Sequence, residues 1–159
     1  MTAAVLRRRL TRADAADALV LYNELTFGPP ADTPAAFFAV LDHPGTQVHG
    51  VFEEDRLVAM VTLHLLPNAL WSGRPYALIE NVVTRRDCQR RGFGRAAMQS
   101  AIDAAWAAQA YKIMLMSGKA RGARGFYEAL GFSTEDKFAF VLRHDATVSG
   151  RAAHPQAGS

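Results

Sequence analysis

The sequence is poor in residues that stabilise secreted proteins or bind metals. Its single cysteine, Cys88, excludes an intramolecular disulfide and suits a reducing compartment. The five histidines show no ligand spacing with one another or with Cys88, and so predict no metal site. No apolar run approaches the roughly 20 residues that cross a bilayer, and residues 1–12 lack the apolar core of a signal peptide. We therefore expect a cytoplasmic protein that does not bind membranes.

Two signs of nucleotide or nucleic-acid binding are also missing. No Gly-Lys-Ser or Gly-Lys-Thr occurs, which excludes a Walker loop. The net charge is only +3, and neither interleaved stacking aromatics nor a long basic face is visible, so we expect no nucleic-acid partner. Five arginines are concentrated between positions 85 and 95. This concentration favours a single anionic ligand.

The hydrophobic patterns predict an α/β (α+β) domain with a mixed central sheet flanked by helices. We expect one domain over residues 1–145, because half of the 159 residues are hydrophobic, and a flexible tail over 146–159. The strands 48–52, 57–66 and 79–84 should pair antiparallel, and 79–84 should cross over to a parallel strand at 111–116. The remaining expected elements are strands at 5–10 and 137–143 and helices at 15–25, 35–41, 93–110 and 123–130.

A polar elbow, residues 85–95, joins the strand 79–84 to the long helix. The first amides of a helix lack carbonyl partners and carry partial positive charge, and glycine allows close backbone approach, so Gly92 and Gly94 predict an anion site. The same glycines fit the dinucleotide pattern G-x-G-x-x-A. However, seven polar residues precede the first glycine, and the next strand ends without the acid that holds a ribose. A dinucleotide site is disfavoured, and a purely structural role of the glycines stays open.

Two motifs resemble the GNAT N-acetyltransferase superfamily. The spacing Gln-x-x-Gly-x-Gly after a Val-Val strand resembles its acyl-CoA pyrophosphate loop, and Phe126-Tyr127-x-x-x-Gly131-Phe132 is similar to the sequence near the end of its domains. The predicted element order is that of the GNAT fold. The nearest likeness within the superfamily is to glucosamine-6-phosphate N-acetyltransferases, through residues 24–26, 79–83, 111–113 and 126–128.

The resemblance implies acetyl-CoA as co-substrate, no metal, and a homodimer. Its implied cofactor-binding residues are Val82, Val83, Thr84, Gln89, Arg90, Arg91, Gly92, Phe93, Gly94, Arg95 and Tyr127. The backbone of the two valines would bind the pantetheine, and Gln89 through Arg95 would hold the pyrophosphate. The implied acceptor site contains Thr26, Trp71, Glu80 and Asn81.

Glu80 and Tyr127 are the candidate catalytic residues. A carboxylate inside an apolar strand is costly to bury unless it is hydrogen-bonded or faces a cleft, so Glu80 could accept the proton of an ammonium substrate, directly or through water. The alternative is an ion pair that orients an arginine. By the resemblance, the Tyr127 hydroxyl would donate to the leaving thiolate of CoA. The alternative is a core aromatic with a satisfied hydroxyl.

Departures from the resembled enzymes concern the acceptor. Their lysine and histidine, which help to hold the sugar phosphate, correspond to Asn68 and Trp71, and their acidic residues correspond to Asn81 and Met116. The lost cations argue against a phosphorylated sugar, and Trp71 suggests a flatter or more apolar amine. We expect an N-acetyltransferase that moves the acetyl group of acetyl-CoA to a primary amine of a small molecule by direct attack in a ternary complex. The alternative is a non-catalytic CoA-binding sensor or interaction module.

Overall fold

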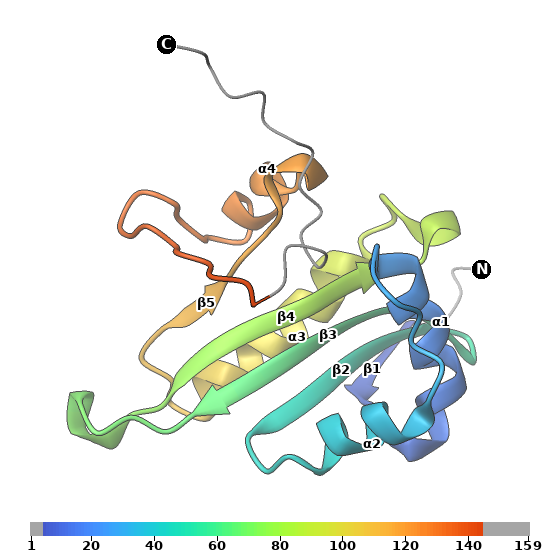
Figure 1. Ribbon diagram of the computed structural model, residues 1–159, viewed down its shortest axis with the longest axis horizontal. Helices are drawn as coiled ribbons and strands as arrows, with labels where there is room; N and C mark the ends of the chain where they lie inside the picture. The colour runs from blue at the N-terminus through green and yellow to red at the C-terminus, as the bar shows by residue number, and fades with distance from the viewer. Residues whose placement is uncertain (1–4, 145–159) are drawn as a thin grey trace.

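A five-stranded sheet forms the centre of the computed structural model, which describes residues 5–144 (Figure 1). The strands follow in spatial order as β1 (Val5–Arg9), β2 (Thr46–Glu53), β3 (Arg56–Leu66), β4 (Tyr76–Thr84) and β5 (Ile113–Leu115). The first four are antiparallel neighbours, and β5 is parallel to β4. The predicted mixed sheet is confirmed, whereas the tail expected at 146–159 lies outside the described residues.

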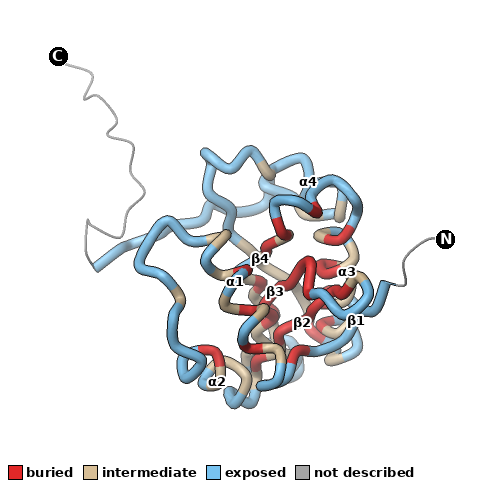
Figure 2. The backbone as a smooth tube through the Cα atoms, turned by 90° about the vertical axis from the view of Figure 1, so that its right-hand side faces the viewer, coloured by how far each residue is buried: buried red, intermediate tan, exposed pale blue. Residues whose placement is uncertain are grey.

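Helices cover both faces of the sheet. Helices α1 (Ala15–Leu25) and α2 (Pro34–Asp42) pack on one face with Val48, Met60 and Val83. Helix α3 (Phe93–Ala107) packs on the other face through its apolar side, in a second cluster with Val61 and Ile79. The buried residues therefore concentrate along β2, β3 and α3 (Figure 2). No helix among the described residues is both long and apolar enough to cross a membrane.

Helix α2 begins at a local sequence signal, whereas the backbone conformation of one residue sets the end of α3. Thr33 is the N-cap of α2 and Pro34 its first residue, as the cap-then-proline pattern predicts. Helix α3 was expected to reach residue 110 but ends at Ala107, because Gln109 adopts a left-handed φ of 59° and the Ala110 amide donates to the Ala105 carbonyl at 3.0 Å. The chain then turns directly into the short strand β5.

The prediction of a last strand at residues 137–143 is wrong, because no strand forms there in the structure. These residues pair with no strand, and Phe138, Phe140 and Leu142 are 90%, 91% and 100% exposed. Alternation of apolar side chains predicted the strand, but a strand forms only where another strand supplies its hydrogen bonds. Helix α4 (Arg124–Glu128), just before this segment, is shorter than the expected 123–130.

Candidate functional site

Strand β4 separates from β5 halfway along its length. Their pairing ends at Ile79 and Leu115, so from Glu80 onward this edge of β4 has no strand partner in the described part of the chain. At the same point the pairing with β3 shifts, because Met60 lies opposite Val83 whereas Thr62 lies opposite Glu80. Asn81 takes up the extra residue with a left-handed φ of 52°, a conformation that asparagine tolerates better than most residues. The bulge and the divergence leave Val82, Val83 and Thr84 with one free edge.

The elbow that follows β4 is shaped for close approach to its backbone. Gly92, the N-cap of α3, has a φ of 86°, and a Cβ placed on it would meet no atom within 4 Å. The Ala96 amide donates to the Gly92 carbonyl at 3.0 Å, so the preceding amides of Phe93, Gly94 and Arg95 have no acceptor inside the helix. Open space therefore lies beside amides that favour an anion.

Gly94 has a different role from Gly92. A Cβ on Gly94 would lie 2.8 Å from the Thr84 hydroxyl oxygen and 3.7 Å from the Phe126 ring. The absence of a side chain lets the first turn of α3 pack directly against the end of β4. Gly92 thus leaves room for a ligand to approach the backbone, and Gly94 lets α3 pack closely on β4.

Most elbow arginines bind other parts of the protein. Arg85 is buried and donates to the Leu57 carbonyl at 2.7 Å and to Asp17 at 3.0 Å. Arg91 pairs with Glu53, and Arg95 donates to the Ala129 carbonyl at 2.9 Å. Of the arginines predicted to bind the cofactor, Arg91 and Arg95 thus also bind other parts of the protein, whereas Arg90 does not in the described chain. Arg86, Arg90, Arg91 and Arg95 are all exposed, and only Arg85 is buried.

Cys88 and Phe93 pack beneath the elbow. Both are buried, at 2% and 6% exposure, in the cluster formed with α3. Burial raises the pKa of the Cys88 thiol, which disfavours the reactive thiolate. Cys88 therefore fits the interpretation of a small packing side chain, and Phe93 can reach a ligand only through its backbone amide.

The negative charge of Glu80 acts on the Tyr127 phenol. Burial raises the pKa of the Tyr127 phenol, Arg121 lowers it and the negative charge of Glu80 raises it further. Within residues 5–144, Glu80 forms no ion pair, so the alternative of an arginine-orienting role lacks a partner. The Tyr127 ring packs edge-on against Phe126 and Phe132, at 5.1 and 6.2 Å between centroids. A fixed ring with a neutral hydroxyl can donate a hydrogen bond.

Thr26 follows α1, in a loop that Arg121 fastens beside this pair. Arg121 donates to the Leu25 carbonyl at 2.9 Å, and its guanidinium lies 5.1 Å from the centre of the exposed Phe27 ring. Arg121 also lowers the pKa of the Tyr127 phenol. The sequence analysis did not identify Arg121, since it belongs to no motif. Its only signal was a basic residue six positions before Tyr127.

Trp71, which the resemblance places at the acceptor, does not lie beside the elbow. It belongs to the loop that precedes β4, whereas the elbow follows the opposite end of that strand. Its ring stacks on Tyr111 at 5.3 Å between centroids. Asn68, in the same loop, donates to the Leu70 carbonyl at 3.0 Å. Local stacking holds the Trp71 loop at the start of β4, and the place of Trp71 at the acceptor stays a prediction.

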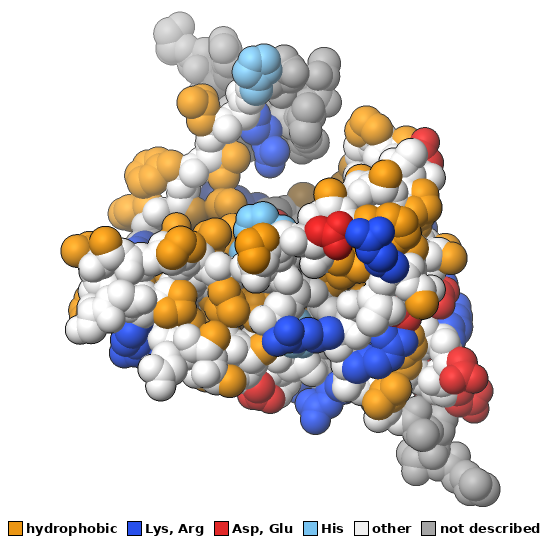
Figure 3. All heavy atoms as spheres, turned by 90° about the horizontal axis from the view of Figure 1, so that it is seen from below, with side chains coloured by type: hydrophobic (Ala, Val, Ile, Leu, Met, Phe, Trp, Pro, Cys, Tyr) orange, Lys and Arg blue, Asp and Glu red, His pale blue; other side chains and the backbone are white. Residues whose placement is uncertain are grey.

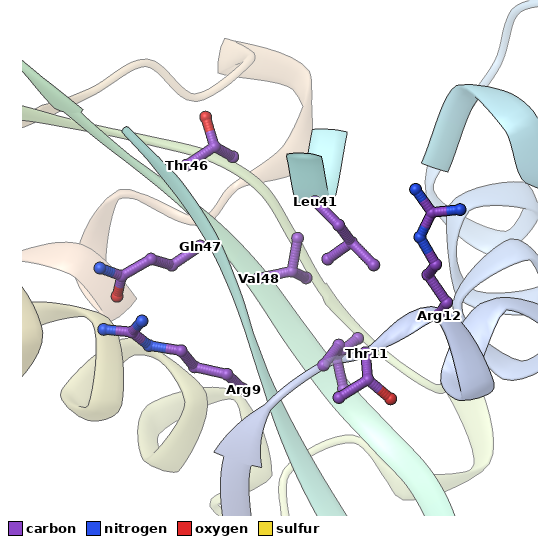
Figure 4. Close-up of a pocket in the computed structure, with 8 residues that line it drawn as sticks. Arg9, Thr11, Arg12, Leu41, Thr46, Gln47 and Val48 are labelled. Carbon is purple, nitrogen blue, oxygen red and sulfur yellow. The ribbon is translucent and has the colours of Figure 1, made fainter. Parts of the chain in front are cut away.

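A pocket at the start of β2, beside Thr46, contains none of the predicted site residues (Figure 4). Arg9, Leu41 and Thr46 are among the side chains around it. The elbow contacts the far end of β2 through the pair of Arg91 and Glu53. This pocket is therefore separate from the gap at β4.

Comparison with known proteins decides the family. The model of the acetyltransferase (GNAT) family matches residues 14–132. The chain belongs to this family. This GNAT protein is 36% identical to the structure of a putative acetyltransferase from Agrobacterium tumefaciens str. C58, with a TM-score of 0.81 and coverage of 87% of this chain and 99% of that one. No curated protein sequence matches it.

More distant structures share the fold of this GNAT protein. Glucosamine-6-phosphate N-acetyltransferase from Arabidopsis thaliana has a TM-score of 0.78 at 18% identity, covering 89% of this chain and 99% of that one. Ribosomal-protein-alanine N-acetyltransferase from Brucella melitensis biovar Abortus 2308 has a TM-score of 0.76 at 19% identity, covering 89% and 100%. The names of these two enzymes give different amine acceptors, so the shared fold does not specify the acceptor of this chain.

Proposed function

We propose that this GNAT protein transfers the acetyl group of acetyl-CoA to a primary amine of a small molecule, with both substrates bound at once. One observation carries the proposal: the unpaired edge of β4 begins at Glu80 and leads into the elbow, where the space beside Gly92 is open and the Phe126 ring of α4 lies 3.7 Å from a Cβ placed on Gly94. Glu80 and Tyr127 form no ion pair in the described chain, and the charge of Glu80 acts on the Tyr127 phenol. A purely structural elbow would need neither the open space nor the two unpaired groups.

The residues of the elbow suit acetyl-CoA. The free amides of Phe93, Gly94 and Arg95 would bind pyrophosphate oxygens, and the exposed Arg90 and Arg86 would supply charge. The free edge of β4 at Val82 and Val83 would bond the pantetheine amides in the manner of an added strand. When bound, acetyl-CoA supplies a thioester that an amine can attack.

Glu80 and Tyr127 would each assist one proton transfer, Glu80 at the amine and Tyr127 at the departing sulfur. Glu80 would accept a proton from the ammonium form of the acceptor, directly or through one water. The backbone amide near Val82 would stabilise the negative oxygen that forms when the neutral amine attacks the thioester carbonyl. Tyr127 would donate its hydroxyl proton in a hydrogen bond to the departing sulfur, which its raised pKa permits by keeping the phenol neutral.

The acceptor would enter beside Thr26 and the loop that Arg121 fastens. A small molecule fits better than a nucleic acid, because the net charge is only +3. The face in Figure 3 carries hydrophobic, acidic and basic side chains together. The cytoplasm, where acetyl-CoA is available, is the proposed location. A non-catalytic CoA-binding sensor on the same fold is the competing function, and the retained Glu80 and Tyr127 disfavour it.

An acceptor screen tests the proposal. Purified protein is mixed with acetyl-CoA and, in turn, amino sugars, polyamines, amino acids, arylamines and short peptides, and thiol release is followed. We expect release that depends on one class of amine and on protein concentration. Tight acetyl-CoA binding without amine-dependent release from any class would favour the sensor.

A further inference from the structure

Arg121 is a cation with unused hydrogen-bonding capacity. Its guanidinium donates from Nη2 to the Leu25 carbonyl at 2.9 Å and lies 5.1 Å from the centre of the Phe27 ring. Within residues 5–144 it forms no ion pair, and its remaining N–H groups have no acceptor. A guanidinium carries several N–H donors in a planar fork. The ring and the carbonyl therefore fix Arg121 and leave part of its fork available to an anion.

The contact between Arg121 and Leu25 joins two segments that flank the unpaired edge of β4. Arg121 belongs to the chain that follows β5, whose pairing with β4 stops halfway along β4. Leu25 ends α1, which packs against the end of β4 through the cluster that contains Val83. The neighbouring Glu24 accepts a hydrogen bond from the Arg86 amide at 2.8 Å, at the start of the elbow. The free donors of Arg121 are thus held close to the end of β4.

The loop that carries Phe27 is fixed by its own hydrogen bonds. The Asn23 side chain closes it, because it accepts from the Ala31 amide at 2.8 Å and donates to the Ala31 carbonyl at 2.9 Å. The Thr26 hydroxyl oxygen accepts from the Gly28 amide at 2.9 Å. Phe27 itself is 89% exposed. A closed loop that presents a fixed ring beside a fixed cation loses little conformational entropy when a ligand binds.

Glu80 supplies a charge of the opposite sign at the start of the unpaired edge. It is half-buried and forms no ion pair in the part of the chain that the structure describes. The charges of Glu80 and Arg121 also share a neighbour, since both act on the pKa of the Tyr127 phenol. Two uncompensated charges of opposite sign complement a ligand that carries both an ammonium and an anionic group.

We propose that Arg121 determines the specificity of the acceptor site and selects an amine that also carries a carboxylate, as an amino acid does. The ammonium would face Glu80, and the two carboxylate oxygens would match the planar fork of Arg121. A phosphate group carries more negative charge, which this single cation would offset less well beside Glu80. This selectivity rests on the proposed function, because it names the substrate class of the same site.

The first test compares amines with and without the carboxylate. Thiol release from acetyl-CoA is measured for α-, β- and γ-amino acids, each beside its own carboxamide, which keeps the amine and the side chain. We expect the wild type to prefer at least one acid over its carboxamide roughly tenfold or more in kcat/KM, because a site built to bind a polar group rejects the analogue without it. Equal use of every pair, or a preference for every carboxamide, would overturn the selectivity.

Substitution of Arg121 separates recognition of the carboxylate from fastening of the loop. Arg121→Gln keeps a donor for the Leu25 carbonyl but removes the charge, so kcat/KM should fall roughly tenfold or more for the acid and change little for the carboxamide. Arg121→Lys keeps the charge without the fork and should retain part of the preference. An equal fall for both amines would assign Arg121 to the loop alone.

The control for these variants is Arg74→Gln. Arg74 is also exposed and also donates to backbone carbonyls, those of Gln109 at 3.0 Å and Ala110 at 3.3 Å, but it lies before the start of β4, at the end opposite the elbow. Its variant should keep the wild-type preference for the acid. Loss of the preference in this variant as well would show that the selectivity does not come from Arg121.

A binding measurement tests the same contact without turnover. The N-acetyl derivative of an amino acid has lost its ammonium but keeps its carboxylate. Calorimetry on protein saturated with CoA should show that Arg121→Gln binds N-acetyl amino acids roughly tenfold more weakly than the wild type, with unchanged affinity for acetyl-CoA. Weaker acetyl-CoA binding with unchanged binding of the N-acetyl amino acids would place Arg121 at the CoA and overturn the selectivity. Binding that depends on Arg121 in a protein that acetylates no amine would uphold the carboxylate site and contradict the proposed function alone.

Discussion

Tyr127 is the residue on which the chemistry of the leaving group depends. Its ring is held by Phe126 and Phe132, and burial raises the pKa of its phenol. No hydrogen-bond partner of the hydroxyl lies within residues 5–144, so the alternative of a core aromatic with a satisfied hydroxyl is not what the structure shows. The hydroxyl is available to a ligand.

Changing Tyr127 to Phe removes that hydroxyl and keeps the ring. The lost hydrogen bond strengthens as charge develops on sulfur, so kcat should fall while the affinity for acetyl-CoA stays nearly unchanged. For a charge-assisted bond of about 1.5 to 3 kcal/mol, the fall is roughly tenfold to a few hundredfold. Steady-state kinetics on the best acceptor, with thermal melts, measure it.

The matched control for this change is Tyr76→Phe. Tyr76 begins β4, at the end opposite the elbow, and its ring lies 5.8 Å from the Lys112 ammonium. Its kcat should equal that of the wild type. A folded Tyr127→Phe variant with wild-type turnover, where chemistry limits the rate, would assign Tyr127 to packing alone.

Gly92 and Gly73 provide a matched pair for the anion site. Both have left-handed φ angles, of 86° and 74°, and a Cβ on either would meet nothing within 4 Å. Replacement by Asp therefore imposes a similar backbone strain and the same charge at both positions. Only Gly92→Asp places that charge beside the free amides of α3, so only this variant should lose acetyl-CoA affinity, by at least tenfold. Calorimetry showing equal affinity for the two variants would refute the anion site at the elbow.

At the scale of elements, the junction of β4 and α3 sets the shape of the site. The close approach of the helix to the strand requires a residue without a Cβ at Gly94, because Thr84 Oγ1 would lie 2.8 Å from it. The bulge at Asn81 then turns the end of β4 away from β5. Backbone geometry at these two points opens the gap between the strands.

Gly94→Ala should lower the free energy of unfolding by about 1 to 3 kcal/mol, as overpacking in a close contact does. Thr84→Ala removes the oxygen that the new Cβ would meet. The double variant should therefore lose less stability than the sum of the two single variants. Urea unfolding of all four proteins measures the coupling, and strict additivity would contradict the assigned contact.

Periodicity predicted the elements wherever their partners lie within the same chain. The α1 boundaries, the order of the strands and the crossover from β4 to β5 follow from residues that bury against each other locally. The same alternation misplaced residues 137–143, because a strand also needs a neighbouring edge, which a sequence pattern does not specify. The end of α3 was missed because it depends on one left-handed residue, Gln109.

In the candidate site, too, local patterns could be predicted from the sequence and tertiary contacts could not. Motif spacing predicted Gly92, Gly94 and Tyr127, and a carboxylate inside an apolar strand predicted Glu80; their roles stay predictions. The pairing of Arg91 with Glu53 depends on β2, 38 residues away along the chain, so the elbow sequence alone could not show it. The tertiary contacts of Arg121 were hidden for the same reason.

At the scale of the whole molecule, the distribution of cations bears on the acceptor. In the described chain, Arg121 is the cation that acts on Tyr127, and it already donates to the Leu25 carbonyl. Without a further cation committed to a phosphate, glucosamine 6-phosphate should be a poorer acceptor than at least one unphosphorylated amine. Specificity constants measured side by side decide this. A clear preference for the phosphosugar would contradict the interpretation of Asn68 and Trp71.

The central claim is that this chain moves an acetyl group from CoA to an amine directly. Its most direct measurement uses acetyl-CoA labelled with ¹³C in the acetyl group, the best amine from the screen, and mass spectrometry of both the small molecules and the intact protein. The account predicts one labelled acetyl group on the amine nitrogen for each thiol released, and no labelled protein at any time. Labelled protein that forms before the product, or acetyl-CoA that stays intact with every amine, would contradict it.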